Sequence, residues 1–174
     1  MDELVDVLDS VTGKATGEVI SKSEAHSKGI WHGAVHIWVI NSLGDKILLQ
    51  KRCALKKLFP NMWDISVGGH ISNGEDAYIG ALRELNEELG IVLENEKLEF
   101  VKCIKEEFVS SGIISNEFVT VYKLVKDIEI SDITLQDEEV SDVMWVNKED
   151  FNKLIDEKKI IDHSEEFKLL NEIL

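Results

Sequence analysis

Hydrophobic and polar positions recur along the chain with the periods of strands and helices. Two β-rich runs at residues 35–40 and 46–52 are separated by NSLGD, whose turn-forming residues predict a hairpin. Between residues 75 and 89 apolar positions repeat at helical spacing, and Gly90 supplies a stop signal. We also expect a short strand at 63–69, strands at 99–108, 117–125 and 140–146, and helices at 148–157 and 164–173. This mixture predicts an α/β or α+β fold.

Composition indicates the size and the environment of the protein. The 174 residues are 44% hydrophobic and contain no linker-like segment, so we expect a single domain over residues 1–174. The formal net charge of −15 opposes binding to a nucleic-acid polymer or to an anionic membrane surface. Cys53 and Cys103 lack CxxC spacing, and no run approaches the roughly 20 apolar residues of a membrane span. A cytoplasmic location is expected.

The helix expected at 75–89 carries three carboxylates on one face. Glu84, Glu87 and Glu88 fall within a sector of about 100° beside the apolar stripe. Like charges so close together repel, and a hard divalent cation with oxygen ligands would reverse that interaction. Gly68 and Gly69 precede the helix and allow the backbone to approach a phosphate closely. The alternative interpretation is an ordinary solvated helix face that follows an ordinary loop.

A longer motif contains these residues. The pattern GX5EX7REUXEEXGU is matched without exception by Gly69, Glu75, Arg83, Glu84, Leu85, Glu87, Glu88, Gly90 and Ile91. On this motif the chain resembles the MutT-like Nudix hydrolases and is identified as a member of that superfamily. The resemblance implies an α/β/α sandwich around a mixed β-sheet, in which the motif forms a loop, a helix and a second loop.

The resemblance also implies roles for residues of the motif. Glu84 and Glu88 match metal ligands of the family, and Glu87 matches a further direct or water-mediated ligand. The implied cofactor is Mg²⁺ or Mn²⁺, which would neutralise a diphosphate and help to activate water for attack on phosphorus. Arg83 matches the residue that orients these carboxylates, and Glu75 matches a position that commonly pairs with that arginine.

Over residues 7–146 the chain is similar to a narrower branch of the superfamily, that of the isopentenyl-diphosphate isomerases. The segments LDSVTGKATGEVISKSEAH, LKKLFPNMWDISVGGH and SNEFVTVY carry this similarity. It implies an N-terminal extension of about 30 residues packed on the core. In the isomerases, histidines that match His26, His32 and His70 bind a metal together with two glutamates, one of which matches Glu117.

Two positions depart from the isomerase pattern. Gly68 stands where the isomerases have a catalytic cysteine, and Ser115 stands where they have the other metal-binding glutamate. A hydrogen atom cannot replace a thiol in acid–base chemistry, and a site with one carboxylate fewer binds its cation more weakly. Isomerisation is therefore disfavoured. Whether the three histidines still bind a second metal is an open question at this point.

Other residues complete the predicted site. The general base is expected to be Glu84 or Glu117. His36 lies in an alternating strand and suits a structural or substrate-facing role, whereas His163 is expected at the surface. A basic segment, QKRCALKK, lies near the glycines and offers groups that bind phosphate. The expected substrate-binding residues are Arg52, Gly68, Gly69 and His70.

These features favour a metal-dependent hydrolase that cleaves the pyrophosphate linkage of a nucleoside diphosphate or of a small molecule linked to one. Glu84 and Glu88 are expected to be exposed to the site rather than buried in the core. The alternatives are an isopentenyl-diphosphate isomerase and a noncatalytic nucleotide-binding module. The expected partner is a small phosphoanhydride. Homodimers occur among relatives, but no residue in the sequence identifies an interface.

Overall fold

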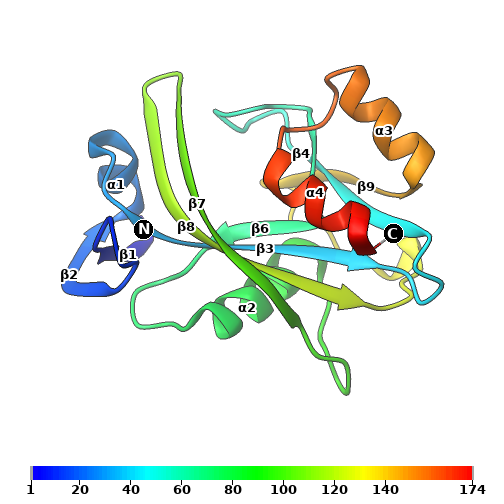
Figure 1. The fold of residues 1–174 in the computed structure, drawn as a ribbon, viewed down its shortest axis with the longest axis horizontal. Coiled ribbons are helices and arrows are strands. Elements are labelled where there is room, and N and C mark those ends of the chain that lie inside the picture. Colours follow the sequence, from blue (N-terminus) through cyan, green and yellow to red (C-terminus); the bar gives the residue numbers. More distant parts are fainter. Residues whose placement is uncertain (1, 174) are drawn as a thin grey trace.

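A seven-stranded mixed sheet forms the centre of the computed structural model, which describes residues 2–173 (Figure 1). Its strands run in the order β5-β4-β3-β8-β7, with β6 also paired to β3 and β9 to β4. Only β3 and β8 pair in parallel within the described sheet. The strands are β3 (His32–Ile40), β4 (Lys46–Arg52), β5 (Trp63–Asp64), β6 (Val67–His70), β7 (Glu99–Ser110), β8 (Ile113–Val125) and β9 (Val140–Asn147).

Helices cover both faces of this sheet (Figure 1). They are α2 (Ala77–Leu89) on one face, and α3 (Lys148–Asp156) and α4 (Ser164–Ile173) on the other. Alternate residues of β3 define the two faces, as the pleat of a strand requires. Val35, Ile37 and Val39 pack with α2, whereas Ala34 and Trp38 pack with α3 and α4. The predicted mixed sheet between helical layers is confirmed.

The best-predicted elements lie around the first hairpin and the central helix. β3 and β4 pair antiparallel with Val39 opposite Leu48, so the predicted hairpin is present. Helix α2 begins two residues later than predicted, because Asp76 caps it by accepting a hydrogen bond from a backbone N–H of the first turn. Glu75 is thereby left outside the helix. Gly90 ends the helix in the left-handed conformation, with a φ of 68°.

Two strands extend beyond their predicted bounds. β7 and β8 continue to the turn at Ser111 and Gly112, whose φ angles are 52° and 77°. The two strands form a long hairpin that rises away from the rest of the sheet (Figure 1). The single strand predicted at 63–69 is divided into β5 and β6. Ser66 lies between them, and its hydroxyl binds the backbone of both β3 and β4.

The segment that precedes β3 forms a second, two-stranded sheet and a helix, which pack beside the large sheet. β1 (Leu4–Leu8) and β2 (Ala15–Ser21) pair antiparallel, and α1 (Lys22–Lys28) follows directly. Helix α1 packs against β8. A short 3-10 helix, η1 (Ile130–Asp132), precedes β9. Over residues 2–173, no helix combines the length and the apolar character needed to cross a bilayer.

Candidate active site

Arg83 connects the helix α2 to the strand β6. Its Nε and Nη2 atoms donate to the two carboxylate oxygens of Glu75, each at 2.9 Å. Its Nη1 atom donates to Glu84 at 2.7 Å and to Glu87 at 3.1 Å, and Nη2 also donates to the His70 carbonyl at 2.9 Å. A planar guanidinium is suited to so many simultaneous contacts. The structure thus brings the predicted Arg83 and Glu75 pair together and fixes α2 relative to β6.

Glu84 and Glu88 lie directly beneath the glycines of β6. A Cβ atom added at Gly69 would lie 2.1 Å from the Glu84 carboxyl carbon, so the helix approaches this closely only because residue 69 has no side chain. The Gly68 N–H donates to Glu88 at 3.3 Å, and the Gln50 amide donates to the same oxygen at 3.1 Å. The expectation that both glutamates are exposed is wrong. They are 8% and 4% exposed, because α2 packs directly on β6.

Burial disfavours the charged forms of the Glu84 and Glu88 carboxylates, and nearby positive charge compensates them only in part. Burial, assisted by the charge of Glu84, raises the pKa of Glu88 to about 8. Burial also raises the pKa of Glu84, although Arg83 acts in the opposite direction. A bound cation would supply the missing charge, so the donor set fits a hard divalent metal. Glu87 is half-exposed and bonded to Arg83, and the three helix carboxylates do not all converge within 4.8 Å in the described chain.

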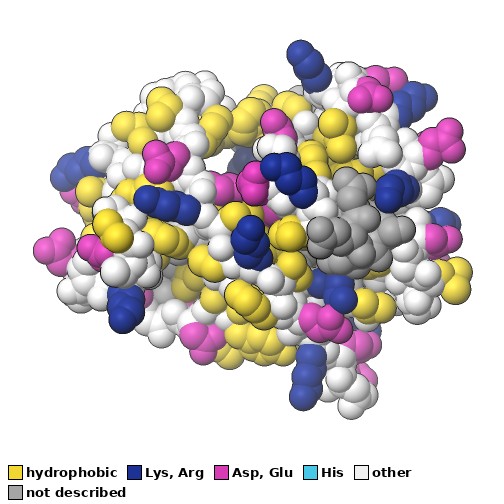
Figure 2. All heavy atoms as spheres, viewed as in Figure 1, with side chains coloured by type: hydrophobic (Ala, Val, Ile, Leu, Met, Phe, Trp, Pro, Cys, Tyr) yellow, Lys and Arg dark blue, Asp and Glu magenta, His cyan; other side chains and the backbone are white. Residues whose placement is uncertain are grey.

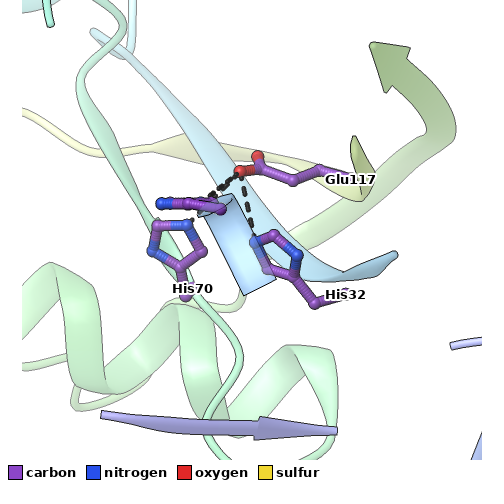
Figure 3. A group of neighbouring side chains, drawn as sticks. His32, His70 and Glu117 are labelled. Atoms are coloured by element: carbon purple, nitrogen blue, oxygen red, sulfur yellow. Dashed lines mark ion pairs between the residues drawn. The ribbon is translucent and has the colours of Figure 1, made fainter. Parts of the chain in front are cut away.

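Four side chains from four elements form a second group, the histidine cluster. It consists of His26 of α1, His32 of β3, His70 of β6 and Glu117 of β8. One oxygen of Glu117 lies 3.5, 3.4 and 3.3 Å from the Nε2 atoms of the three rings in that order, as Figure 3 shows for the labelled residues. The parallel pairing of β3 and β8 places His32 opposite Glu117. The fold therefore brings together residues that are far apart in the sequence, since His26 and Glu117 are separated by 91 positions.

The histidine cluster has the chemistry of a metal site. None of its three buried Nε2 atoms has a hydrogen-bond partner among the described residues, and such orphaned atoms are costly. Nitrogen donors with one carboxylate suit zinc or a transition metal. The Ile30 carbonyl lies 2.8 Å from Nδ1 of His32 and orients that ring. Although burial alone would raise the pKa of Glu117, contact with the imidazoles holds it well below its usual range. Ser115 donates a hydrogen bond to the same carboxylate.

A pocket of about 490 Å³ joins the histidine cluster to Gly68 and Gly69. It opens between the tip of the β7–β8 hairpin and the loop over residues 53–62, where Figure 2 shows a hollow in the surface. Arg52 faces this pocket and is held by Asp64 at 3.3 Å and by the Leu58 carbonyl at 3.2 Å. Basic groups on its wall lie beside five carboxylates, those of Asp64, Glu106, Glu117, Glu138 and Glu139, and all but Lys57 of these basic groups form an ion pair. The basic groups are Lys22, Arg52, Lys56 and Lys57.

The prediction that His163 lies at the surface is wrong. Its side chain is 10% exposed because α4 packs on the sheet, and its Nε2 atom lies 2.8 Å from Asp64. Burial alone would lower the pKa of His163, but the bond to Asp64 raises it to about 10. His36 similarly pairs with Glu166 at 2.6 Å. Sequence reasoning missed this pair, although a carboxylate on the same face of α4 as Leu170 is a signal of a buried partner.

The fold and these groups define an enzyme-like site with a glutamate-bearing helix beneath a glycine strand. The NUDIX domain family matches residues 31–166 of this chain. The chain therefore belongs to the Nudix family of hydrolases.

Named relatives lie in two groups. The chain is 37% identical over 158 residues to Nudix hydrolase 3 of Arabidopsis thaliana, an alignment that covers 88% of this chain and 20% of that protein. It is 39% identical over 140 residues to an uncharacterized Nudix hydrolase of Clostridium acetobutylicum, an alignment that covers 79% of this chain and 68% of that protein. It is also 32% identical over 151 residues to the isopentenyl-diphosphate Delta-isomerase of Aliivibrio fischeri, and this alignment covers 84% of this chain and 82% of the isomerase. The chain thus spans a fifth of the Arabidopsis protein.

Solved structures share the fold. A crystal structure from Deinococcus radiodurans superposes with a TM-score of 0.74 at 21% identity and covers 98% of this chain and 99% of that one. A MutT protein from Methanosarcina mazei superposes with a TM-score of 0.64 at 19% identity, covering 82% and 94%. The mixed sheet with its surrounding helices is therefore the Nudix fold.

Proposed function

We propose that this protein is a metal-dependent hydrolase that cleaves the pyrophosphate linkage of a nucleoside diphosphate or of a small molecule linked to one. The observation that carries the proposal is the pair of buried carboxylates, Glu84 and Glu88, packed against the two glycines of β6. Burial raises the pKa of both carboxyl groups, and a divalent cation bound between them would favour their charged forms. The adjoining pocket offers three lysines and an arginine that can contact a phosphate, and bound cations would offset the carboxylates on the same wall.

Glu84 and Glu88 would hold the metal, with Glu87 as a further direct or water-mediated ligand. A divalent cation bound there supplies Lewis-acid chemistry, because it offsets charge on phosphate oxygens and makes water more acidic. The protein's own contribution is positioning. Arg83 fixes the carboxylates relative to β6 through the contacts described above. Gly68 and Gly69 allow the substrate to approach the backbone, and Arg52 binds a phosphate from the pocket wall.

The histidine cluster would hold a second metal ion. Its nitrogen donors fit zinc, manganese or iron better than magnesium, so the two sites differ in the cation they prefer. In this proposal Glu117 serves as a ligand of that ion. Its strongly lowered pKa makes it a weak base, which leaves Glu84 as the favoured candidate for the general base.

Isomerisation of isopentenyl diphosphate is the second candidate, because named isomerases are among the relatives and the histidine cluster is assembled. The chain has no thiol where that chemistry would need one. Residue 68 is glycine, Cys53 is buried at the end of β4, and Cys103 lines a different pocket. We therefore expect no migration of the double bond.

A substrate panel tests the proposal. We expect the purified protein to release phosphate or a nucleoside monophosphate from nucleoside diphosphates and from diphosphate-linked compounds only when Mg²⁺ or Mn²⁺ is added. Glu88→Gln should lower kcat by two orders of magnitude or more, roughly the loss of a group essential for metal catalysis. Glu149→Gln, an exposed change on α3, is the matched control and should retain full turnover.

Two results would contradict the proposed function. Tight nucleotide binding without turnover under all metal conditions would indicate a noncatalytic module. Conversion of isopentenyl diphosphate to its isomer, without hydrolysis of any nucleotide, would indicate an isomerase.

A further inference from the structure

The buried carboxylate of Glu166 orients the imidazole of His36 toward the pocket. His36 lies on β3, and its Nδ1 atom is 2.6 Å from one oxygen of Glu166 on α4. Trp38 Nε1 donates to the other oxygen of Glu166, which is only 1% exposed. Because both oxygens are engaged inside the protein, Glu166 does not meet a ligand itself. It fixes Nδ1 of His36 as the donor to the carboxylate, so Nε2 is the nitrogen available to the pocket.

His36, Glu106, His163 and Glu166 also bring their ligand atoms within 4.8 Å of one another, but their contacts differ from those of the histidine cluster. The cluster's nitrogens lie 3.3–3.5 Å from one carboxylate oxygen and have no hydrogen-bond partner among the described residues. By contrast, His36 and Glu166 are separated by 2.6 Å, and His163 and Asp64 by 2.8 Å. The shorter separations are those of hydrogen bonds that share a proton, whereas the longer ones leave room for a central ion. His36 therefore has the surroundings of a proton donor.

Gly68 leaves the edge of the His36 ring accessible. β3 and β6 pair antiparallel with His36 opposite Gly68, and a Cβ atom at residue 68 would lie 3.0 Å from Ile65 Cδ1 and 3.4 Å from His36 Cδ2. A longer side chain at residue 68 would cover the ring. Successive residues of a strand face opposite sides, and a Cβ atom at Gly69 would instead meet Glu84. His36 and Gly68 both line the pocket that contains Arg52.

We infer that His36 binds the substrate, with its Nε2–H donating to a phosphate oxygen from the side of β6 opposite to Glu84. The inference rests on the proposed function and assigns Glu166 as a positioning residue. Burial alone would lower the pKa of His36, but the charge of Glu166 raises it, with Glu106 acting in the same direction and His163 against it. A protonated imidazole donates the strong, charge-assisted hydrogen bond that a phosphate oxygen accepts.

His36→Asn tests this role, because the asparagine amide can still donate to Glu166 while the group at Nε2 is lost. The probe is inorganic pyrophosphate in the presence of Mg²⁺, measured by calorimetry on the full chain. We expect Kd to rise about tenfold or more, the loss of one hydrogen bond between charged groups. Trp38→Phe removes the other contact of Glu166 without altering Nε2, and its Kd should stay close to that of the unmodified protein. An equal rise in both variants would assign the effect to loosening of α4 and would overturn the inference.

A second measurement needs neither a variant nor turnover. The ring nitrogens of His36 in the unmodified protein should change their NMR chemical shifts when pyrophosphate and Mg²⁺ are added. Unchanged shifts at saturation would overturn the inference even if His36→Asn failed to fold. If pyrophosphate moves these shifts but no compound is hydrolysed, the proposed function fails and the binding role of His36 stands. Loss of a bound zinc equivalent in His36→Asn would make the residue a metal ligand and would also overturn the inference.

Discussion

Two adjacent glycines separate the chemical groups of this site. A side chain at Gly69 would collide with Glu84, and one at Gly68 would cover His36, so the backbone of β6 is bare on both sides. This arrangement allows carboxylates, an imidazole and a phosphate to approach the same short strand. The charged residues alone therefore do not define the site. They approach β6 closely only because Gly68 and Gly69 have no side chains.

Gly69→Ala tests this dependence. The added Cβ atom would lie 2.1 Å from the Glu84 carboxyl carbon and 2.3 Å from its Oε1 atom, so the Glu84 side chain or the whole helix must move. We expect turnover to fall by about two orders of magnitude, since misplacement by an ångström can cost that much. Gly80→Ala, a change in α2 whose nearest contact is 3.4 Å, is the matched control and should keep the enzyme active. Equal turnover in Gly69→Ala and the unmodified protein would contradict this account.

At the scale of elements, α4 docks through charged groups as well as apolar ones. Phe167 and Leu170 pack in the core, but Glu166 and His163 bring a carboxylate and an imidazole into the same interface. Breaking one partner of a buried pair leaves the other charge uncompensated, which is strongly destabilising. The attachment of this helix should therefore depend on pH.

His163→Asn tests that dependence. The folded-state pKa of His163 is raised to about 10 from the ordinary value of 6.5, so its contribution to stability is fully present below about pH 6.5 and is lost as pH rises through about 10. Its neighbours Asp64, Glu106 and Glu166 provide the negative charge. We expect the variant to lose about 3 kcal/mol of unfolding free energy at pH 6. Urea unfolding should show this difference shrinking between pH 6.5 and 10, with the exposed Asp162→Asn as control. A difference that does not change with pH would exclude the ionic attachment.

The two helices differ in how far sequence could predict their roles. α2 carries its chemistry within one contiguous motif, and the cap at Asp76 and the stop at Gly90 are local signals. α4 was predicted as a helix, but nothing local shows that Glu166 meets His36, which lies 130 positions earlier. Alternation along a strand assigns residues to a face, but it does not name the partner that covers that face. For the same reason His163 was misplaced at the surface.

At the scale of the whole molecule, β6 lies between two groups of potential metal ligands whose donor chemistry differs. The carboxylates of α2 offer hard oxygen donors, whereas the histidine cluster offers three nitrogens from elements that the sheet brings together. The first group was predicted as a metal site from the spacing of residues between 69 and 91. The second was recognisable in the sequence only through similarity to the isomerases, because its ligands lie on α1, β3, β6 and β8.

His26→Ala tests whether the histidine cluster binds a metal ion independently of the carboxylates of α2. His26 lies on α1 with its side chain 19% exposed, so its removal should disturb the core less than removal of the fully buried His32. After loading with Zn²⁺ or Mn²⁺ and removal of free metal, the unmodified protein should retain one tightly bound ion. The variant should bind that ion at least about tenfold more weakly, as elemental analysis and competition with a chelator would show. The Mg²⁺ concentration needed for half-maximal turnover should change little, because that requirement belongs to Glu84 and Glu88. Lys28→Ala, an exposed change on the same helix, controls for α1 itself. Equal retention of metal by His26→Ala and the unmodified protein would show that the orphaned nitrogens of the histidine cluster do not hold an ion.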